Sequence, residues 1–234
     1  MASNEAEHWW FAGRRAVVAT LVRRLIDPPA GARVLEVGCG SGGNLDLLGG
    51  FGRVDAIEQD ATARATARAR TGLAVREGAL PHDLPVPDGA YDLVALLDVL
   101  EHVDADRASL DAIGRKLGPD GRLLITVPAM PWLWSAHDAV HHHKRRYTRA
   151  SLGATIAAAG LRVERIGYFN GFLFPLAVAS RALKAIVGDR SGDDEMPPAP
   201  LNGALRRIFA SERHLIGRVP FPVGLSVFAI VRRP

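Results

Sequence analysis

Residues 38–43 are rich in glycine and follow directly on an apolar stretch, an order that few folds accommodate. The stretch itself, residues 32–37, is apolar apart from Arg33 and Glu36, as expected for a strand buried on both faces of a parallel sheet. Residues 44–48 then have the composition of a first helical turn. Glycine lets a backbone approach a ligand closely, and the N–H groups at the start of a helix point outward. The sequence therefore predicts a ligand-binding corner between a strand and a helix.

A second apolar stretch, residues 54–57, ends at Glu58. Glu58 stands about twenty residues after Gly38, the distance at which an acidic side chain accepts hydrogen bonds from both hydroxyls of a ribose. The glycine run and Glu58 together predict a cofactor that contains a nucleoside. Gly38, Gly40 and Gly43 also fit the glycine pattern of dinucleotide-binding proteins, so an NAD-dependent oxidoreductase is one alternative.

Residues 36–42 resemble the first motif of the class I S-adenosylmethionine (SAM)-dependent methyltransferases, an acidic residue followed by x-G-x-G-x-G. Further blocks continue the resemblance in the same order, at residues 78–80, 84–94, 98–103 and 117–123. The resemblance spans residues 32–128 and implies SAM as the cofactor. It also implies an α/β fold with a Rossmann-like, doubly wound, seven-stranded, mostly parallel sheet, an antiparallel last strand and three αβα layers.

On this resemblance residues 1–30 form N-terminal lid helices, and residues 31–234 form the methyltransferase domain with a mobile insertion at about 189–203. Cys39 is the sole cysteine, which excludes an internal disulfide and fits a reducing compartment. The N-terminus lacks the pattern of a signal peptide, and the longest apolar run, residues 166–180, is too short and interrupted to span a bilayer. We therefore expect a cytoplasmic protein.

An amphipathic helix is predicted over residues 16–26, after a segment rich in aromatic residues and arginine. The resemblance implies that Trp10 and Phe11 shield SAM and that Arg14 reaches its carboxylate; the alternative is a helix that packs on the sheet. Family members often bind adenine with an acidic residue after the third strand, which this sequence lacks. The residues expected around the cofactor are Trp10, Arg14, Glu36, Gly38, Gly40, Asn44, Glu58, Gln59, Ala79, Leu80 and Asp98.

Residues 128–147 follow the fifth predicted strand and are rich in aromatic and titratable side chains. With the N-terminal His-Trp-Trp-Phe segment, they resemble a methyltransferase subgroup, some of whose members resemble enzymes of polysaccharide, glycolipid or natural-product assembly. His137 is the first candidate for a general base, because an imidazole accepts protons near neutral pH. Asp138 would orient it, and His143 and Tyr147 are the next candidates for a catalytic role. Tyr147 or Arg146 is also expected to bind substrate.

Asp98, at the end of the fourth predicted strand, allows two interpretations. In the first, Asp98 caps the next helix and Glu101 lies one turn further on. In the second, Asp98, Glu101 and His102 resemble the set of residues with which quinone-biosynthesis O-methyltransferases bind magnesium, although the first position there is usually Glu. We predict no metal, because many relatives carry Glu-His here without one.

The charge of the chain is uneven. Residues 1–127 hold 14 basic and 18 acidic side chains, a net charge of −4, and residues 128–234 hold 15 and 7, a net charge of +8. The basic part favours an anionic or lipid-linked small-molecule acceptor. The apolar stretch at 168–187 fits peripheral contact with a membrane, or alternatively a helix that covers the sheet or makes a homodimer contact. A nucleic-acid substrate is disfavoured, because no Asn-Pro-Pro-Tyr-type block and no appended recognition module are present.

These features predict SAM-dependent methyl transfer, with O-methylation of a small-molecule, sugar, glycolipid or natural-product acceptor as the preferred reaction. The sulfonium is already activated, so catalysis would consist mainly of positioning the acceptor. Two alternatives stay open: a protein of this fold that binds SAM without methylating, such as a scaffold or a cyclase, and the NAD-dependent oxidoreductase.

Overall fold

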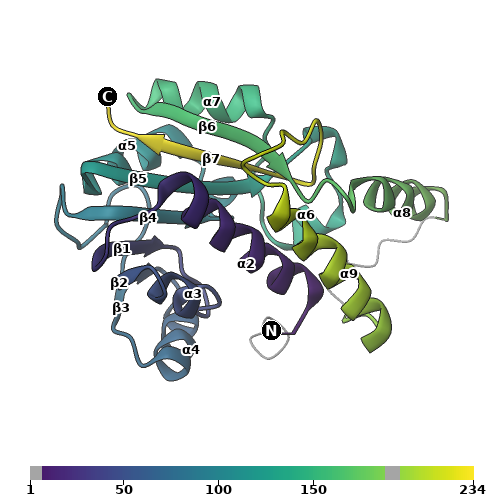
Figure 1. The fold of residues 1–234 in the computed structure, drawn as a ribbon, viewed down its shortest axis with the longest axis horizontal. Coiled ribbons are helices and arrows are strands. Elements are labelled where there is room, and N and C mark those ends of the chain that lie inside the picture. The colour runs from purple at the N-terminus through teal and green to yellow at the C-terminus, as the bar shows by residue number, and fades with distance from the viewer. Residues whose placement is uncertain (1–6, 188–195) are drawn as a thin grey trace.

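A computed structural model of the protein describes residues 7–187 and 196–234. A seven-stranded sheet with the strand order β3-β2-β1-β4-β5-β7-β6 forms its centre (Figure 1). Strands β1 to β5 pair in parallel, and β7 is antiparallel to both β5 and β6. The strands are β1 (Ala32–Val37), β2 (Gly52–Glu58), β3 (Val75–Glu77), β4 (Tyr91–Leu97), β5 (Leu117–Pro128), β6 (Arg162–Phe169) and β7 (Ser226–Arg232). The predicted fold class is confirmed.

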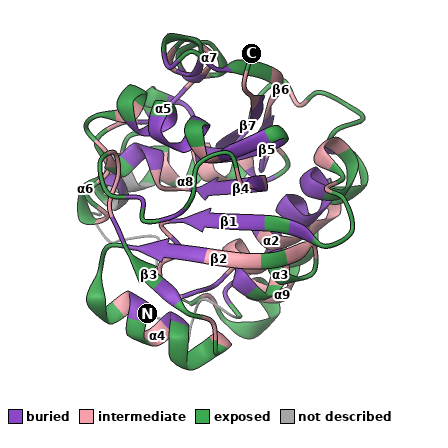
Figure 2. Cartoon of the chain, turned by 90° about the vertical axis from the view of Figure 1, so that its left-hand side faces the viewer, coloured by how far each residue is buried: buried purple, intermediate pink, exposed green. Residues whose placement is uncertain are grey.

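Helices cover both faces of this sheet, because successive side chains of a strand point to opposite faces and both sets are apolar here. In β4, Leu93 and Ala95 pack in the cluster that includes α2 and α9, whereas Val94 and Leu96 pack in the cluster that includes α5 and α7. The central strands β1 and β4 are consequently buried except near their starts, at Arg33 and Asp92 (Figure 2). The helices are α2 (Trp9–Leu21), α3 (Leu45–Gly49), α4 (Ala61–Thr71), α5 (Asp106–Lys116), α6 (Ala136–Val140), α7 (Arg149–Ala158), α8 (Phe174–Val187) and α9 (Ala199–Ser211).

Helix α2 begins earlier than the sequence pattern predicted. It starts at Trp9, capped by the His8 side chain, so the aromatic segment is its first turn. A π-helical turn, Val22–Ile26, continues it and ends at Asp27, which has a positive φ of 48° and precedes Pro28. Proline lacks the N–H that a further helical turn needs. The predicted helix over 16–26 therefore identified the second half of a longer element.

Asp98 does not cap a regular helix. Its φ is +55°, a 3-10 turn (Leu100–His102) follows it, and α5 begins at Asp106. The capping interpretation is wrong, because the chain leaves β4 through a left-handed residue, which is not the extended conformation of an N-cap.

The predicted insertion at 189–203 overlaps α9, whose first residue is Ala199; residues 188–195 lie outside the described part of the chain. Strand β3 is short and begins at Val75, the last residue of the apolar stretch 73–75. Among the described residues, no helix combines the length and the apolar character needed to cross a membrane.

Candidate active site

A cavity of about 610 Å³ lies at the carboxyl ends of the central strands. Gly38 follows β1, Asp98 follows β4 and Pro128 ends β5, and all three line it. Further parts of the wall come from helices α2, α8 and α9, the turn after β4, the segment after β5 and the start of β7. This is the edge at which doubly wound sheets bind ligands, at the point where the strand order reverses between β1 and β4.

The glycine loop forms one end of the cavity. Gly38 has a φ of +73°, and a Cβ atom there would lie 2.7 Å from a methyl carbon of Val99, so a side chain fits neither the backbone nor the space. Gly40 also has a positive φ, of 55°, but a Cβ atom there would meet nothing within 4 Å, because this residue faces open space. The loop therefore presents bare backbone to the cavity.

Two buried carboxylates hold this loop. The Gly40 amide donates to Glu58 Oε2 at 2.8 Å, and Glu58 Oε1 accepts from the Asp60 amide at 2.8 Å. The Asn44 side chain donates to Glu36 Oε1 at 2.9 Å. Each carboxylate oxygen can accept more than one hydrogen bond, so Glu58 retains the capacity to accept from a ribose hydroxyl. Its role toward the ribose stays a prediction.

Arg14 of α2 enters the cavity from the opposite side. Arg14 is 6% exposed, its guanidinium lies 5.1 Å from the centre of the Trp10 ring, and its Nε is 2.9 Å from Asp98 Oδ2. Within the described part of the chain, its Nη2 is buried without a hydrogen-bond partner. A buried guanidinium nitrogen of this kind fits a ligand carboxylate, such as the one at the methionine end of SAM. The site thus fits the cofactor that the sequence indicates.

Asp138, His143 and Arg146 form a buried network on the other wall. Arg146 donates from Nε to Asp138 Oδ1 at 2.7 Å and from Nη2 to Oδ2 at 2.9 Å, and His143 Nδ1 lies 2.9 Å from Oδ1. Burial raises the pKa of Asp138, but the hydrogen bonds from His143 and Arg146 lower it more, so its pKa falls well below the ordinary value. Asp138 is therefore an ionised carboxylate that fixes the His143 ring.

Glu101 and His102 lie beside His143 in the cavity wall, with the rings of the two histidines 4.8 Å apart between their centres. The ligand atoms of these three residues lie within 4.8 Å of one another, a spacing that suits one divalent cation. Burial and the nearby Asp98 charge raise the pKa of Glu101 well above its ordinary value, and both its oxygens lack a hydrogen-bond partner among the described residues. Burial, and then the His143 charge, lower the pKa of His102. Without a cation the neutral forms of Glu101 and His102 are favoured.

The structure brings about half of the predicted site residues to the cavity wall. Glu36, Glu58 and Asp138 are buried behind the wall and hold residues that line it. Burial at Cys39 in the glycine loop raises the pKa of its thiol to about 12, which favours a packing role over a reactive one. The predicted residues that do line the cavity are Trp10, Phe11, Arg14, Gly38, Gly40, Asn44, Asp98, His143 and Arg146.

Other predicted residues lie elsewhere. The Tyr147 hydroxyl donates to Asp106 Oδ2 at 2.9 Å; burial, followed by the Asp106 charge, raises its pKa far above the ordinary value, which favours a structural role. Gln59 is exposed, and Ala79, beside Leu80, pairs through its backbone with Asp83. Tyr147, Gln59, Ala79 and Leu80 are not among the described residues that line the cavity. The side chain of His137 lies outside the described part of the structure, so its role stays a prediction.

Sequence reasoning missed the contribution of α8 and α9 to the cavity wall. Leu176 and Ala177 line it from the start of α8, Leu173 lines it from the residue before that helix, and Leu205 lines it from α9. The apolar stretch at 168–187 was noticed, but its composition fits a membrane contact, a dimer contact and a cavity wall equally. His8 and His141 also line the cavity, and their pattern in the sequence carried no signal that distinguished them from other histidines.

Comparison with known proteins agrees with this geometry. A protein of Mycolicibacterium smegmatis named a probable S-adenosylmethionine-dependent methyltransferase is 32% identical over 170 residues, a match that covers 70% of this chain and 64% of that protein. A ubiquinone biosynthesis O-methyltransferase of Xanthomonas axonopodis is 29% identical, covering 62% of this chain and 68% of the relative. The cyclase SpnF has the same fold, with a TM-score of 0.60 and 20% identity over 95% of this chain and 81% of its own.

The profile of the family described as "Methyltransferase domain" matches residues 10–166, more than half of the chain. This region contains the glycine loop, Glu58, Arg14, Asp98 and the Asp138 network. The chain belongs to this methyltransferase family, and its cofactor is S-adenosylmethionine.

Proposed function

We propose that this protein transfers the methyl group of SAM to a hydroxyl oxygen of a small-molecule acceptor, with His143 as the general base. The contact between His143 Nδ1 and Asp138 Oδ1 carries this proposal. The carboxylate favours the neutral tautomer whose proton is on Nδ1, so Nε2 is the nitrogen that accepts a proton. His143 lines the same cavity as the glycine loop, where His137 was the expected base.

SAM supplies an activated methyl group, so the protein needs to place an oxygen in line with it and remove the hydroxyl proton. In this transfer the acceptor hydroxyl would lose its proton to His143 Nε2 as its oxygen takes the methyl group, whose bond to the sulfonium sulfur breaks and leaves S-adenosylhomocysteine. Asp138 stabilises the resulting imidazolium, because it is held as a carboxylate. Arg146 keeps Asp138 in place through two hydrogen bonds.

The cavity wall supports an amphipathic acceptor. The wall carries the polar side chains of Glu101, His102 and His143 as well as apolar residues such as Leu173 and Leu205. An acceptor with a hydroxyl at one end and an apolar portion at the other fits both. The name of the Xanthomonas relative, an O-methyltransferase, supports oxygen as the nucleophile.

Release of S-adenosylhomocysteine tests the proposal, measured with a panel of phenols and sugars with and without alkyl chains. We expect turnover with alkylated hydroxyl compounds, and a loss of about 100-fold or more in His143→Ala with unchanged SAM affinity. His82→Ala, an exposed histidine away from the cavity, is the matched control.

A larger loss in His137→Ala than in His143→Ala would transfer the role of base to His137. SAM binding without S-adenosylhomocysteine release from any acceptor would favour a non-methylating protein. That function exists on this fold, since SpnF is a cyclase.

A further inference from the structure

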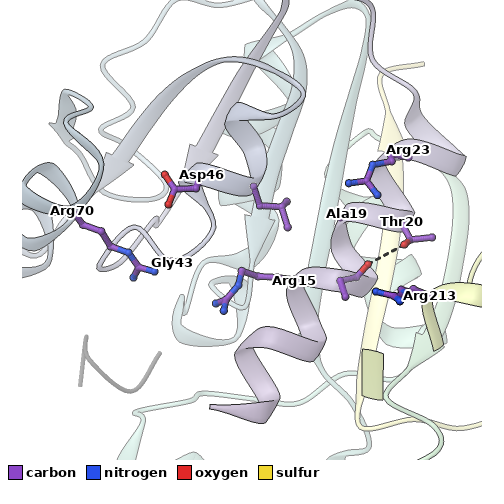
Figure 3. Close-up of a pocket in the computed structure, with 10 residues that line it drawn as sticks. Arg15, Ala19, Thr20, Arg23, Gly43, Asp46, Arg70 and Arg213 are labelled. Carbon is purple, nitrogen blue, oxygen red and sulfur yellow. Dashed lines mark hydrogen bonds between the residues drawn. The ribbon is translucent and has the colours of Figure 1, made fainter. Parts of the chain in front are cut away.

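A second cavity, of about 410 Å³, lies beside α2 and does not share a lining residue with the first (Figure 3). Arg14 and Arg15 are neighbours on α2, but Arg14 lines the cofactor cavity and Arg15 lines this one. Four of its ten lining residues are arginines and one is an acid, a formal net charge of +3. The charged residues are Arg15, Arg23, Arg70, Arg213 and Asp46.

These arginines come from segments far apart in the chain. Arg15 belongs to α2 and Arg23 to the π-helical turn after it, Arg70 to the last turn of α4, and Arg213 to the 3-10 turn Glu212–His214. The fold therefore brings these four arginines together; they do not come from one basic stretch of the sequence. Figure 3 shows Arg23 and Arg213 on either side of Thr20.

Two of the four cations lack an acidic partner. Neither Arg23 nor Arg213 forms an ion pair within the described part of the chain: Arg23 lies 5.7 Å from the centre of the Phe51 ring, and Arg213 Nε is 3.4 Å from His214 Nε2. Arg15 and Arg70 also contact other groups of the chain. The unpaired charges therefore lie at one end of the cavity, around Thr20.

The segment that carries Arg213 is fixed in place. Glu212 is fully buried and accepts hydrogen bonds from the amides of Asn170 at 2.6 Å and Phe172 at 2.8 Å. Arg24 donates to the carbonyl of Ile216 at 3.1 Å and so joins this segment to the end of the N-terminal helix. Because these contacts hold Arg213 near Arg23, a ligand would not have to order either backbone.

We propose that this cavity is an anion site that binds a phosphate group, distinct from the cofactor site. The guanidinium fork matches phosphate oxygens with paired hydrogen bonds, and an anion relieves the repulsion between cations held together. The volume suits a small phosphorylated molecule. A phospholipid headgroup offers the same chemistry, since Arg23 and Arg213 are exposed at the mouth.

Calorimetry with pyrophosphate, at low salt and with SAM present, tests the site without requiring turnover. We expect one binding site per chain, and an affinity about tenfold lower in Arg23→Gln and in Arg213→Gln. Arg213→Lys should lose less than Arg213→Gln, because it keeps the charge but not the fork. Arg165→Gln, an exposed arginine on β6, makes the same change of charge outside the cavity and should bind as the wild type does.

Absence of pyrophosphate binding, or an equal loss in Arg165→Gln, would overturn the proposal. Thermal melting of each variant separates loss of the site from loss of the fold. Co-sedimentation with phosphatidylglycerol vesicles distinguishes the sources of the phosphate. Vesicle binding that depends on Arg23 and Arg213 identifies a lipid headgroup, whereas pyrophosphate binding without vesicle binding identifies a free phosphorylated molecule.

Discussion

The two walls of the main cavity are built in different ways. The cofactor wall consists of the glycine loop, held from behind by Glu58; the positions of both follow from the ends of two adjacent parallel strands. The acceptor wall consists of the irregular segment after β5, in which a buried ion pair between Asp138 and Arg146 holds His143. Backbone geometry organises the first wall, whereas side-chain charge organises the second.

This difference determines what each wall tolerates. A loop held by backbone conformation depends on glycine at positions such as Gly38. A wall held by a buried ion pair depends on both partners, because removing one leaves the other charge without compensation. Substitutions in the acceptor wall should therefore lower the stability of the protein, whereas substitutions in the cofactor wall should lower its affinity for the cofactor.

The largest effect is expected for Asp138→Ala. The Arg146 side chain is 4% exposed and would lose both hydrogen bonds to its carboxylate, so the free energy of unfolding should fall by about 3–5 kcal/mol. Urea denaturation measures it. Asp111→Ala is the control, because Asp111 pairs with Arg115 on the surface of α5 and such pairs contribute about 0.5 kcal/mol or less. Equal losses in the two variants would remove the distinction between the walls.

Glu58→Ala tests the cofactor wall. Glu58 is the expected acceptor from the ribose and also receives the Gly40 amide, so SAM affinity should fall by about 30- to 1000-fold, equivalent to roughly 2–4 kcal/mol. Calorimetry measures the affinity. Glu77→Ala, at the end of the neighbouring strand β3 and mostly exposed, should bind SAM normally. Unchanged affinity in Glu58→Ala would show that the loop needs no carboxylate behind it.

Glu101→Gln tests how the free energy of unfolding depends on pH at a buried carboxyl group beside His143. The folded protein favours the neutral Glu101, whereas the unfolded chain ionises it at the ordinary pKa, so wild-type stability should fall as pH rises above that value. The Gln variant lacks this loss. Its free energy of unfolding, taken relative to that of the wild type, should therefore rise by about 1 kcal/mol or more between pH 5 and pH 8. Denaturation at both pH values measures it. A parallel pH dependence of the two proteins would mean that Glu101 is ionised in the fold.

The smallest effect is expected for removal of divalent cations. Asp98, which corresponds to the first carboxylate of the metal-binding relatives, already pairs with Arg14 at 2.9 Å, and the guanidinium repels a second cation. Turnover should therefore survive EDTA. Loss of activity in EDTA, restored by magnesium, would contradict this and would make Glu101, His102 and His143 ligands.

The acceptor wall was the less predictable part of the site. The segment 128–147 was identified as catalytic from its composition, and His137 was placed ahead of His143 as the general base although both carry the same ring. Which of the two histidines reaches the cavity depends on where the segment 128–147 turns back toward the sheet. Lys144 donates its amide to the Glu101 carbonyl at 2.7 Å, and the Ala129–Tyr147 bridge fixes the return of the segment to β5. Both contacts join residues that are distant in the chain.

The sequence by itself determined the sheet, the glycine loop and the cofactor. Apolar runs and glycines that adopt a positive φ shape the backbone within a few residues of themselves. Their pattern therefore predicts strands and turns without knowledge of which residues pack against them. The tertiary structure decided which charges meet: Arg14 with Asp98 across the cavity, and Arg23 beside Arg213 in the anion site. Charged side chains interact over a few ångströms of space, whatever their separation in the chain, and only packing of the helices on the sheet sets those distances.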